Sequence, residues 1–172
     1  MILCLGEAFS FVKDKTVRRK ASIEAVTGIP VWNETTQEWE SVLTVDDCSG
    51  EIIDLREDED SVDRIILLYT THVDLERVDV KIEIRNESIS MVRSSSINSY
   101  SLFTPRDYGY QTYYLRMNAI AGLHHGLRFK TELKDWNINF DTDSLTMSLV
   151  YSLYSDGSLV GENWGFGLRS SF

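Results

Sequence analysis

The chain has 172 residues, of which 42% are hydrophobic and 26% charged, and its formal net charge is −10. These values predict one globular domain spanning residues 1–172, and the two prolines provide no proline-rich linker to a second domain. The acidic balance argues against nucleic acid as the main partner, because phosphate contacts need a positive surface. Cys4 and Cys48 are too few for a disulfide framework and are expected to be reduced thiols in a cytosolic protein.

The secondary structure of residues 1–45 is only partly predicted by the sequence. Met1–Leu5 is apolar and predicts a first strand or a buried anchor, but it lacks the basic start and the length of a signal peptide. Phe9–Val26 has a mixed periodicity that fits either a helix or a strand. Residues 28–30, Gly-Ile-Pro, predict a break, and Val31–Val45 predicts a short hairpin.

Two segments have opposite charge. Residues 11–20 contain five basic residues and one acidic residue, a balance of +4, whereas residues 51–63 contain seven acidic residues and one arginine, a balance of −6. Such asymmetry can orient a protein toward a partner or toward a second copy of itself. The basic segment is interpreted either as an exposed face or as a contact for phospholipid headgroups or nucleic acid; its basic residues are Lys13, Lys15, Arg18, Arg19 and Lys20.

A meander of three strands is predicted in the middle of the chain. Valines and isoleucines alternate with charged residues throughout Arg77–Arg85, which predicts a strand with one buried and one solvated face. Val62–Val73 and Ser88–Arg93 are expected to pair with it on either side. Before them, residues 46–50 predict a turn, Glu51–Leu55 a short strand and Arg56–Ser61 an exposed acidic loop.

The best helix candidate follows, although Gly122 and Gly126 weaken it. Ser94–Asp107 is expected to be a loop, with or without a short edge strand, and Tyr110–Leu127 carries apolar residues at spacings of three and four. Residues 136–140 and 145–153 then alternate as strands, and Asp156-Gly157 predicts a hairpin turn. The predicted fold class is α+β and β-dominated, an antiparallel sheet or sandwich with one main helix near residues 110–127.

The last predicted strand, Leu159–Phe172, suggests self-association. Trp164, Phe166 and Leu168 lie on one face, and the glycines between them leave the other face bare for the close approach of another backbone. If this strand is a sheet edge, it invites pairing with a second copy.

No catalytic motif was found. The chain lacks a glycine-rich phosphate loop, a nucleophile elbow and paired zinc-binding cysteines. His124 and His125 would point about 100° apart on a helix, which fits a polar helix end better than a metal site. Asp141 and Asp143 are better explained as part of a turn than as a calcium site. The sequence therefore predicts a protein that is not an enzyme and has no metal or cofactor.

Two regions resemble matrix proteins of negative-strand RNA viruses. Residues 99–103 (Ser-Tyr-Ser-Leu-Phe), 105–107 (Pro-Arg-Asp) and 113–118 (Tyr-Tyr-Leu-Arg-Met-Asn) are similar to a strand, loop and helix start in bornavirus matrix proteins. Residues 145–148 (Leu-Thr-Met-Ser), 156–159 (Asp-Gly-Ser-Leu) and Trp164 are similar to a late segment of rhabdovirus matrix proteins. The chain departs from that family in its acidic charge and in lacking a lysine-rich N-terminal tail.

The resemblance implies a structural protein of the virion and host cytoplasm. Such a protein would self-associate, bind and condense the viral nucleocapsid, and link it to the envelope, with the basic segment contacting the nucleocapsid or an anionic membrane and without sequence-specific nucleic-acid binding. The alternative is a soluble β-sandwich binding module or accessory protein that takes a protein or carbohydrate ligand in a groove lined by Trp32, Trp39 and Trp164. An uncharacterised enzyme is the third alternative.

Overall fold

The structure is a computed structural model that describes residues 15–56, 64–73, 75–115 and 126–172. These ranges contain ten β-strands and no helix. The strands are β1 (Lys15–Asn33), β2 (Glu38–Arg56), β3 (Arg64–Val73), β4 (Glu76–Arg85), β5 (Ser88–Ser94), β6 (Ile97–Phe103), β7 (Gly109–Leu115), β8 (Gly126–Phe140), β9 (Ser144–Ser155) and β10 (Ser158–Ser171).

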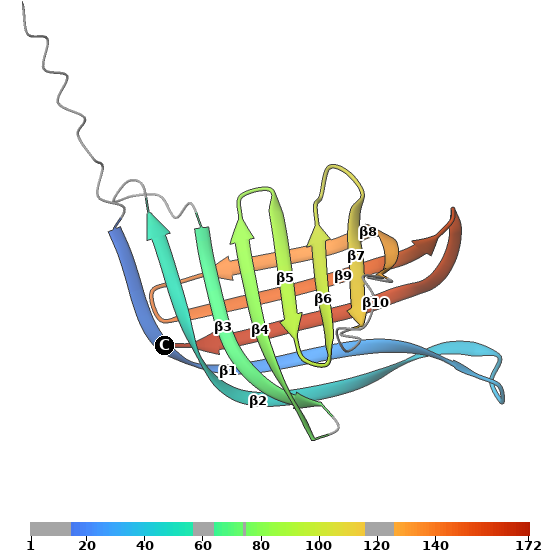
Figure 1. Cartoon of the computed structure of the whole chain (residues 1–172), viewed down its shortest axis with the longest axis horizontal. Helices are drawn as coiled ribbons and strands as arrows, with labels where there is room; N and C mark the ends of the chain where they lie inside the picture. Colours follow the sequence, from blue (N-terminus) through green and yellow to red (C-terminus); the bar gives the residue numbers. More distant parts are fainter. Residues whose placement is uncertain (1–14, 57–63, 74, 116–125) are drawn as a thin grey trace, which may run out of the picture.

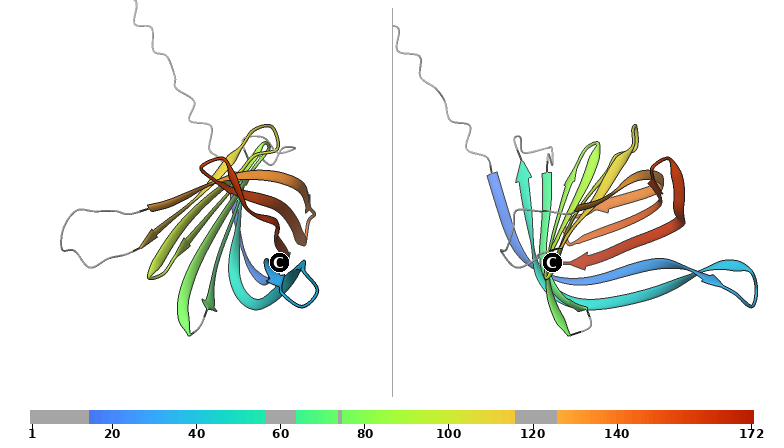
Figure 2. Two further views of the ribbon diagram at one scale, coloured as in Figure 1. Left: turned by 90° about the vertical axis from the view of Figure 1, so that its right-hand side faces the viewer. Right: turned by 45° about the vertical axis from the view of Figure 1, so that its right-hand side comes forward.

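The ten strands form a closed antiparallel barrel. Each strand pairs with the next in the chain, and β1 closes the barrel by pairing with β10 from Ser22 to Gly28. In Figure 1, β3–β7 stand upright in front, while β8–β10 cross behind them at a steep angle. The long strands β1 and β2 curve from the front layer into the rear layer and end in a hairpin that projects from the barrel (Figures 1 and 2).

Alternating side chains build the barrel core. In β4 the inward residues from Val78 to Ile84 are buried, while their neighbours face solvent. The same alternation in β9 buries Leu145, Met147 and Leu149. The predicted strand at residues 77–85, the three-strand meander and the turn at residues 86–87 are all confirmed.

The predicted α+β class is wrong, and so is the sandwich alternative. Residues 109–115 of the expected helix are strand β7, paired on both sides with β6 and β8, and Gly126 begins β8. Residues 116–125 lie outside the described residues. The spacing of three and four residues led to a wrong helix prediction. Aromatic and β-branched residues such as Tyr110 and Thr112 are also favourable in a strand that has neighbours on both sides.

Two expected interruptions are also absent. Residues 28–30 lie within β1 and residues 46–50 within β2, and the two strands pair without a break from Lys15↔Arg56 to Asn33↔Glu38. Pro30 is tolerated because it lies beyond Gly28, the last residue of β1 that pairs with β10. The predicted hairpin at residues 31–45 is therefore the end of one much longer hairpin.

Of two further expectations, the turn at residues 156–157 is confirmed and the loop at residues 94–107 is partly wrong. Asp156 and Gly157, with φ of 50° and 79°, form the predicted tight turn between β9 and β10. Ser94–Asp107, expected to be a loop with at most an edge strand, contains β6, which pairs on both sides. Its serines, Ser99 and Ser101, are buried inside the barrel.

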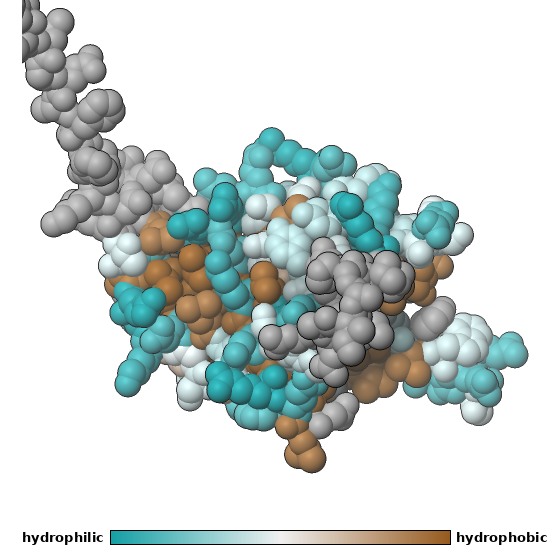
Figure 3. Space-filling view, in the orientation of Figure 1, coloured by the Kyte–Doolittle hydropathy of each residue, from teal (hydrophilic) through white to brown (hydrophobic). Residues whose placement is uncertain are grey.

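The outer surface of the front layer is mixed. Figure 3 shows brown hydrophobic surface among teal hydrophilic side chains on this face. Part of the reason is β3, whose run of apolar residues turns Ile65, Leu67 and Tyr69 inward and Ile66 and Leu68 outward. The run lies in a strand with neighbours on both sides, β2 and β4.

Candidate functional site

The barrel interior has a row of apolar side chains near one end and a row with polar side chains near the other; the first end also contains Asp54, which is fully buried and is paired with Ile65 across β2 and β3. Across β3–β6, one row of directly paired residues consists of Ile65, Ile84, Ile89 and Phe103. Nearer the opposite end, a second row across β3–β7 consists of Tyr69, Val80, Arg93, Ser99 and Tyr113. The polar row is the unusual feature, because a barrel interior of this size is ordinarily filled with apolar side chains.

Arg93 points into this polar end. Its partners across the two ladders, Val80 and Ser99, are 4% and 6% exposed and face the interior. Residues directly opposite each other in an antiparallel pair share a face, so Arg93 is directed inward as well. It is half-buried, which leaves it a route to solvent.

Three tyrosines lie within reach of the Arg93 charge. Burial raises the pKa of Tyr69, Tyr113 and Tyr151, the last to about 12, and the Arg93 charge lowers each pKa by a smaller amount. The three phenols therefore stay protonated at neutral pH and are available as hydrogen-bond donors. Tyr69 and Tyr151 are almost fully buried, and Tyr113 is half-buried.

Arg93 has no counter-ion among the described residues. No carboxylate in those ranges lies within ion-pair distance of its guanidinium, and the guanidinium donates no hydrogen bond there. Asp46 is near enough to raise the pKa of Tyr69, but it forms no ion pair with Arg93. A partly buried cation without a partner is costly, which makes this position a receptor for negative charge.

Gln111 adds an unsatisfied polar atom. Its side chain is 2% exposed, and its Nε2 donates a hydrogen bond to the Tyr113 hydroxyl at 2.7 Å. Its Oε1 has no hydrogen-bond partner within the described part of the chain, and neither has the buried Nε1 of Trp164, which is paired with Tyr151 across β9 and β10. Buried polar atoms without partners are rare in native proteins, because each costs the free energy of desolvation.

We call Tyr69, Arg93, Gln111, Tyr113 and Tyr151 the interior polar cluster. It combines one uncompensated cation, three neutral hydroxyl donors and one free amide oxygen. Phe103 packs against Tyr151 with ring centroids 4.8 Å apart, and Phe129 packs against Tyr113 at 6.1 Å. These groups offer hydrogen-bond donors and one positive charge for an anion, beside aromatic rings that can contact an apolar body.

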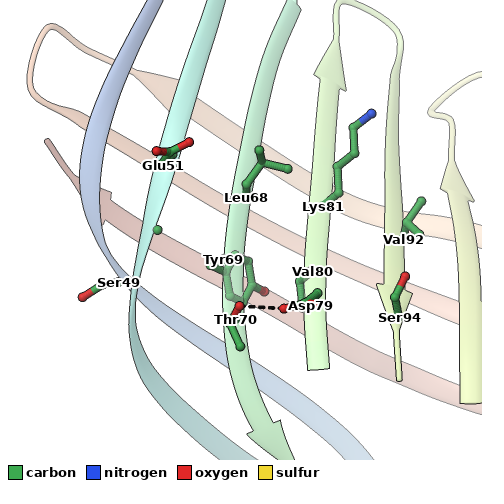
Figure 4. Close-up of a pocket in the computed structure, with 11 residues that line it drawn as sticks. Ser49, Glu51, Leu68, Tyr69, Thr70, Asp79, Val80, Lys81, Val92 and Ser94 are labelled. Carbon is green, nitrogen blue, oxygen red and sulfur yellow. Dashed lines mark hydrogen bonds between the residues drawn. The ribbon is translucent and has the colours of Figure 1, made fainter. Parts of the chain in front are cut away.

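The hollows elsewhere are less suited to a ligand. In a depression of about 400 Å³ on the outer face of β2–β5, part of the polar lining is already paired, since Thr70 Oγ1 donates a hydrogen bond to Asp79 Oδ1 at 2.7 Å (Figure 4). A neighbouring depression of about 380 Å³ is dominated by Glu83, which pairs with Arg64, Lys81 and Arg85.

A third hollow, of about 460 Å³, lies at the apolar end of the barrel. Its lining includes Ile65, Ile84, Trp136, Ile138 and Phe140. Its polar lining consists of Asn86, Asn137 and Arg85, and Arg85 is already paired with Glu83. Because this hollow offers no uncompensated charge from these residues, the interior polar cluster is the stronger candidate for an anion site.

The predicted basic contact does not form one surface. Arg18 and Lys20 are exposed on the outer face of β1, and Arg18 lies 3.6 Å from Glu51. Arg19 turns to the other face, where its Nη1 donates to the Thr142 carbonyl at 2.6 Å and its guanidinium lies 4.0 Å from the Phe172 ring centroid. Lys13 and the side chain of Lys15 lie outside the described residues.

The predicted self-association stripe belongs to the core. Phe166 and Leu168 are 5% and 4% exposed inside the barrel, and Trp164 is half-buried. Strand β10 pairs with both β9 and β1, so it is not the sheet edge that the prediction required. These three residues are unavailable for contact with a second copy unless the barrel opens.

The other sequence predictions concern metals and membranes. In the described ranges, no group of three or more histidine, cysteine or acidic residues lies together. Asp141 and Asp143 form the turn before β9, as expected, and His124 and His125 lie outside the described residues. No helix of the length and apolarity that a membrane span requires occurs in the described part of the chain.

Sequence reasoning missed the interior polar cluster. The available signal was Arg93 itself, which continues the alternation of Ile89 and Met91 at a position where a third apolar residue is expected. Tyr113 was missed because it was assigned to a helix.

Comparison with known proteins bears on the fold alone. No protein-family model and no curated protein matches the chain. Among solved structures, the chain is similar to the ywiB protein from Bacillus subtilis, with a TM-score of 0.65, 14% sequence identity and coverage of 90% of this chain and 92% of that chain. This likeness agrees with the barrel, and nothing in it connects the chain to a virus.

Proposed function

We propose that the protein is a binding protein that holds a small organic anion in the interior polar cluster. The observation that carries this proposal is Arg93, a half-buried, inward-facing cation that lacks a counter-ion among the described residues. Folding a barrel around an uncompensated charge reduces its stability, and a ligand that neutralises the charge recovers that free energy on binding.

The ligand is a carboxylate with an aromatic or alkyl body. A carboxylate accepts two parallel hydrogen bonds from a guanidinium, and the neutral hydroxyls of Tyr113 and Tyr151 can donate to the same oxygens. Phe103 and Phe129, which pack against these tyrosines, provide an apolar wall for the rest of the molecule. The free Oε1 of Gln111 favours a ligand that also carries an N–H or O–H donor.

This proposal keeps the binding module that the sequence suggested and replaces its sandwich and tryptophan groove with a barrel and its interior. Trp32 is exposed on the projecting hairpin, beyond Gly28, where the pairing of β1 with β10 ends. Trp164 is half-buried in β10, and the side chain of Trp39 lies outside the described residues. The viral matrix role and the absence of enzymatic activity remain predictions.

Isothermal titration calorimetry tests the proposal with four probes: benzoate, phenylacetate, inorganic phosphate and neutral benzyl alcohol. We expect wild-type protein to bind at least one carboxylate, and Arg93→Gln to weaken that binding by about tenfold or more, since charge-assisted hydrogen bonds are the strong ones. The matched control, Arg77→Gln, removes an exposed cation of the outer face and should leave binding unchanged. Binding of benzyl alcohol as tight as that of benzoate, or equal binding by Arg93→Gln, would contradict the proposal. Binding of phosphate alone would keep the anion site but reject the carboxylate.

A further inference from the structure

The projecting hairpin has apolar residues on both of its faces. Beyond Gly28, where the pairing of β1 with β10 ends, β1 continues to Asn33 and pairs only with β2. We call residues 29–47 the arm. The register places Ile29, Val31 and Val42 on one of its faces and Trp32, Leu43 and Val45 on the other, and all six are between 40% and 65% exposed.

Such an arm is unstable in isolation. A two-stranded hairpin is marginally stable in water, and a contiguous exposed apolar surface usually marks an interaction site. The arm also leaves strand edges free, since β2 pairs with β3 only from Gly50 to Leu55. Both observations indicate that the arm docks on something.

The charge of the arm restricts the partner. Residues 29–47 contain five acidic residues and no lysine or arginine; the acidic residues are Glu34, Glu38, Glu40, Asp46 and Asp47. Two arms pairing edge to edge would set these charges against each other, which is destabilising. The partner surface is therefore cationic, with apolar or aromatic groups to cover the exposed valines and leucine.

A surface of that chemistry exists on the barrel itself. On the outer face of β6–β8, Arg128 lies 4.5 Å from the Tyr110 ring centroid and Lys130 lies 3.2 Å from that of Tyr108. The Tyr110 ring also contacts Tyr100, with centroids 5.5 Å apart. We call these five residues the basic aromatic strip.

The cations of the strip form no ion pair in the described ranges, although Glu132 is near enough for the Lys130 charge to lower its pKa. Most cations around Arg128 and Lys130 do form ion pairs with carboxylates. Arg128 and Lys130 are both exposed. In an acidic protein, two adjacent cations that lie on aromatic rings and form no ion pair with a described carboxylate can attract negative charge.

The dimensions agree with docking between copies. Five residues of extended chain beyond Gly28 span about 17 Å, and the three strands of the strip span about 10 Å. Figures 1 and 2 show the arm projecting away from the body of its own barrel. The contact is heterologous, because two different surfaces meet, so it can continue into open chains of molecules.

We propose that the arm of one molecule docks on the basic aromatic strip of a second copy. This contact is independent of the interior anion site. It gives the self-association expected from the sequence a different location, on β1 and β2 rather than on β10.

Sedimentation velocity over a range of protein concentrations, at 25 mM and 500 mM NaCl, tests the contact. Wild-type protein should associate at low salt and less at high salt, because exposed charges are screened within about 10 Å already at 0.1 M. The arm variant Glu34→Lys/Glu38→Lys/Glu40→Lys and the strip variant Arg128→Glu/Lys130→Glu should each weaken association by about tenfold or more. Mixing the two variants, or combining all five changes in one chain, should restore it.

Two controls separate docking from misfolding. Arg169→Glu changes an exposed cation of β10 outside the strip and should associate like wild-type protein. Circular dichroism should show unchanged strand content in every variant. A wild-type protein that stays monomeric at low salt, single variants that associate normally, or a combination that fails to restore association would each overturn the proposal.

Discussion

The charge of Arg93 on β5 lowers the pKa of Tyr151 on β9, although β6, β7 and β8 lie between these two strands in the barrel wall. The interaction therefore crosses the interior. The inward faces of β5 and β9 therefore lie near each other at the polar end of the barrel, where the Arg93 charge opposes the effect of burial on the Tyr151 pKa.

Replacing Arg93 with Met should stabilise the protein in the absence of ligand. The substitution removes a partly buried cation that lacks a counter-ion and keeps a flexible side chain of similar length, so the free energy of unfolding should rise by about 0.5–2 kcal/mol. Urea denaturation measures it, with the exposed Arg77→Met as the control, expected within about 0.5 kcal/mol of wild type. A clear loss of stability in Arg93→Met would mean that Arg93 makes a stabilising interaction within the protein and is not an unpaired cation.

The tyrosines of the cluster should make the protein sensitive to alkaline pH. Because burial raises the pKa of Tyr151 from 10.0 to about 12 in the folded state, the proton is held more tightly there than in the unfolded chain. The resulting stability is fully present below pH 10 and is lost as the pH rises through 12, and at about 1.4 kcal/mol per pKa unit it amounts to about 2–3 kcal/mol.

Denaturation midpoints at pH 9, 10, 11 and 12 check this prediction. Tyr151→Phe should show a weaker loss of stability over that range than wild type. Tyr108→Phe, which changes an exposed ring of the outer face, should follow the wild-type profile. Identical profiles for Tyr151→Phe and wild type would show that the Tyr151 phenol ionises freely in the folded barrel.

Two neighbouring substitutions in β4 test the orientation of its side chains. Val80 is 4% exposed and faces the interior, so Val80→Asp should place an uncompensated charge in the core and cost several kcal/mol. Lys81 is exposed, and Lys81→Asp should cost about 0.5–1 kcal/mol, mainly through loss of its contact with Glu83. Equal losses in urea denaturation would contradict the half-exposed strand.

The glycines of the long strands make a fourth stability test. A Cβ on Gly50 would collide with the Leu68 carbonyl and lie 2.7 Å from Ile23 Cδ1, so Gly50→Ala should destabilise by about 2–4 kcal/mol. A Cβ on Gly28 would meet nothing closer than Leu43 Cδ2 at 3.4 Å, and Gly28→Ala should cost about 0.5 kcal/mol or less. Thermal unfolding that ranks the two variants in the opposite order would reject the packing of β2 against β3.

Local alternation allowed much of the sheet to be predicted, but not its closure. In strands such as β4 and β9, the alternation of apolar residues predicts which side chains face the interior. The pairing of β1 with β10 joins Ser22 to Ser171, and no local pattern reports a contact over that separation. Without closure, β10 looked like an edge, and its core residues Phe166 and Leu168 looked like an interface.

The interior site was hidden for a related reason. Arg93, Gln111 and Tyr151 come from β5, β7 and β9 and have no motif spacing, so only the folded barrel brings them together. The sequence also lacks a helix-breaking signal strong enough to exclude residues 110–127 from a helix, which concealed the inward face of β7. The exposed basic residues, by contrast, were visible in the sequence as a cluster, yet the strand alternation divides Arg19 from Arg18 and Lys20.

The most direct test of the anion site is a ¹⁵N spectrum of the arginine side chains of the wild-type protein, recorded while benzoate is added. The signal of the Arg93 Nε–H group, assigned through Arg93→Gln, should move and saturate, together with the side-chain amide signal of Gln111, while the Arg77 signal stays in place. Uniform small shifts of the exposed arginines, with the Arg93 signal unchanged up to millimolar benzoate, would contradict the proposal that Arg93 is an anion receptor inside the barrel.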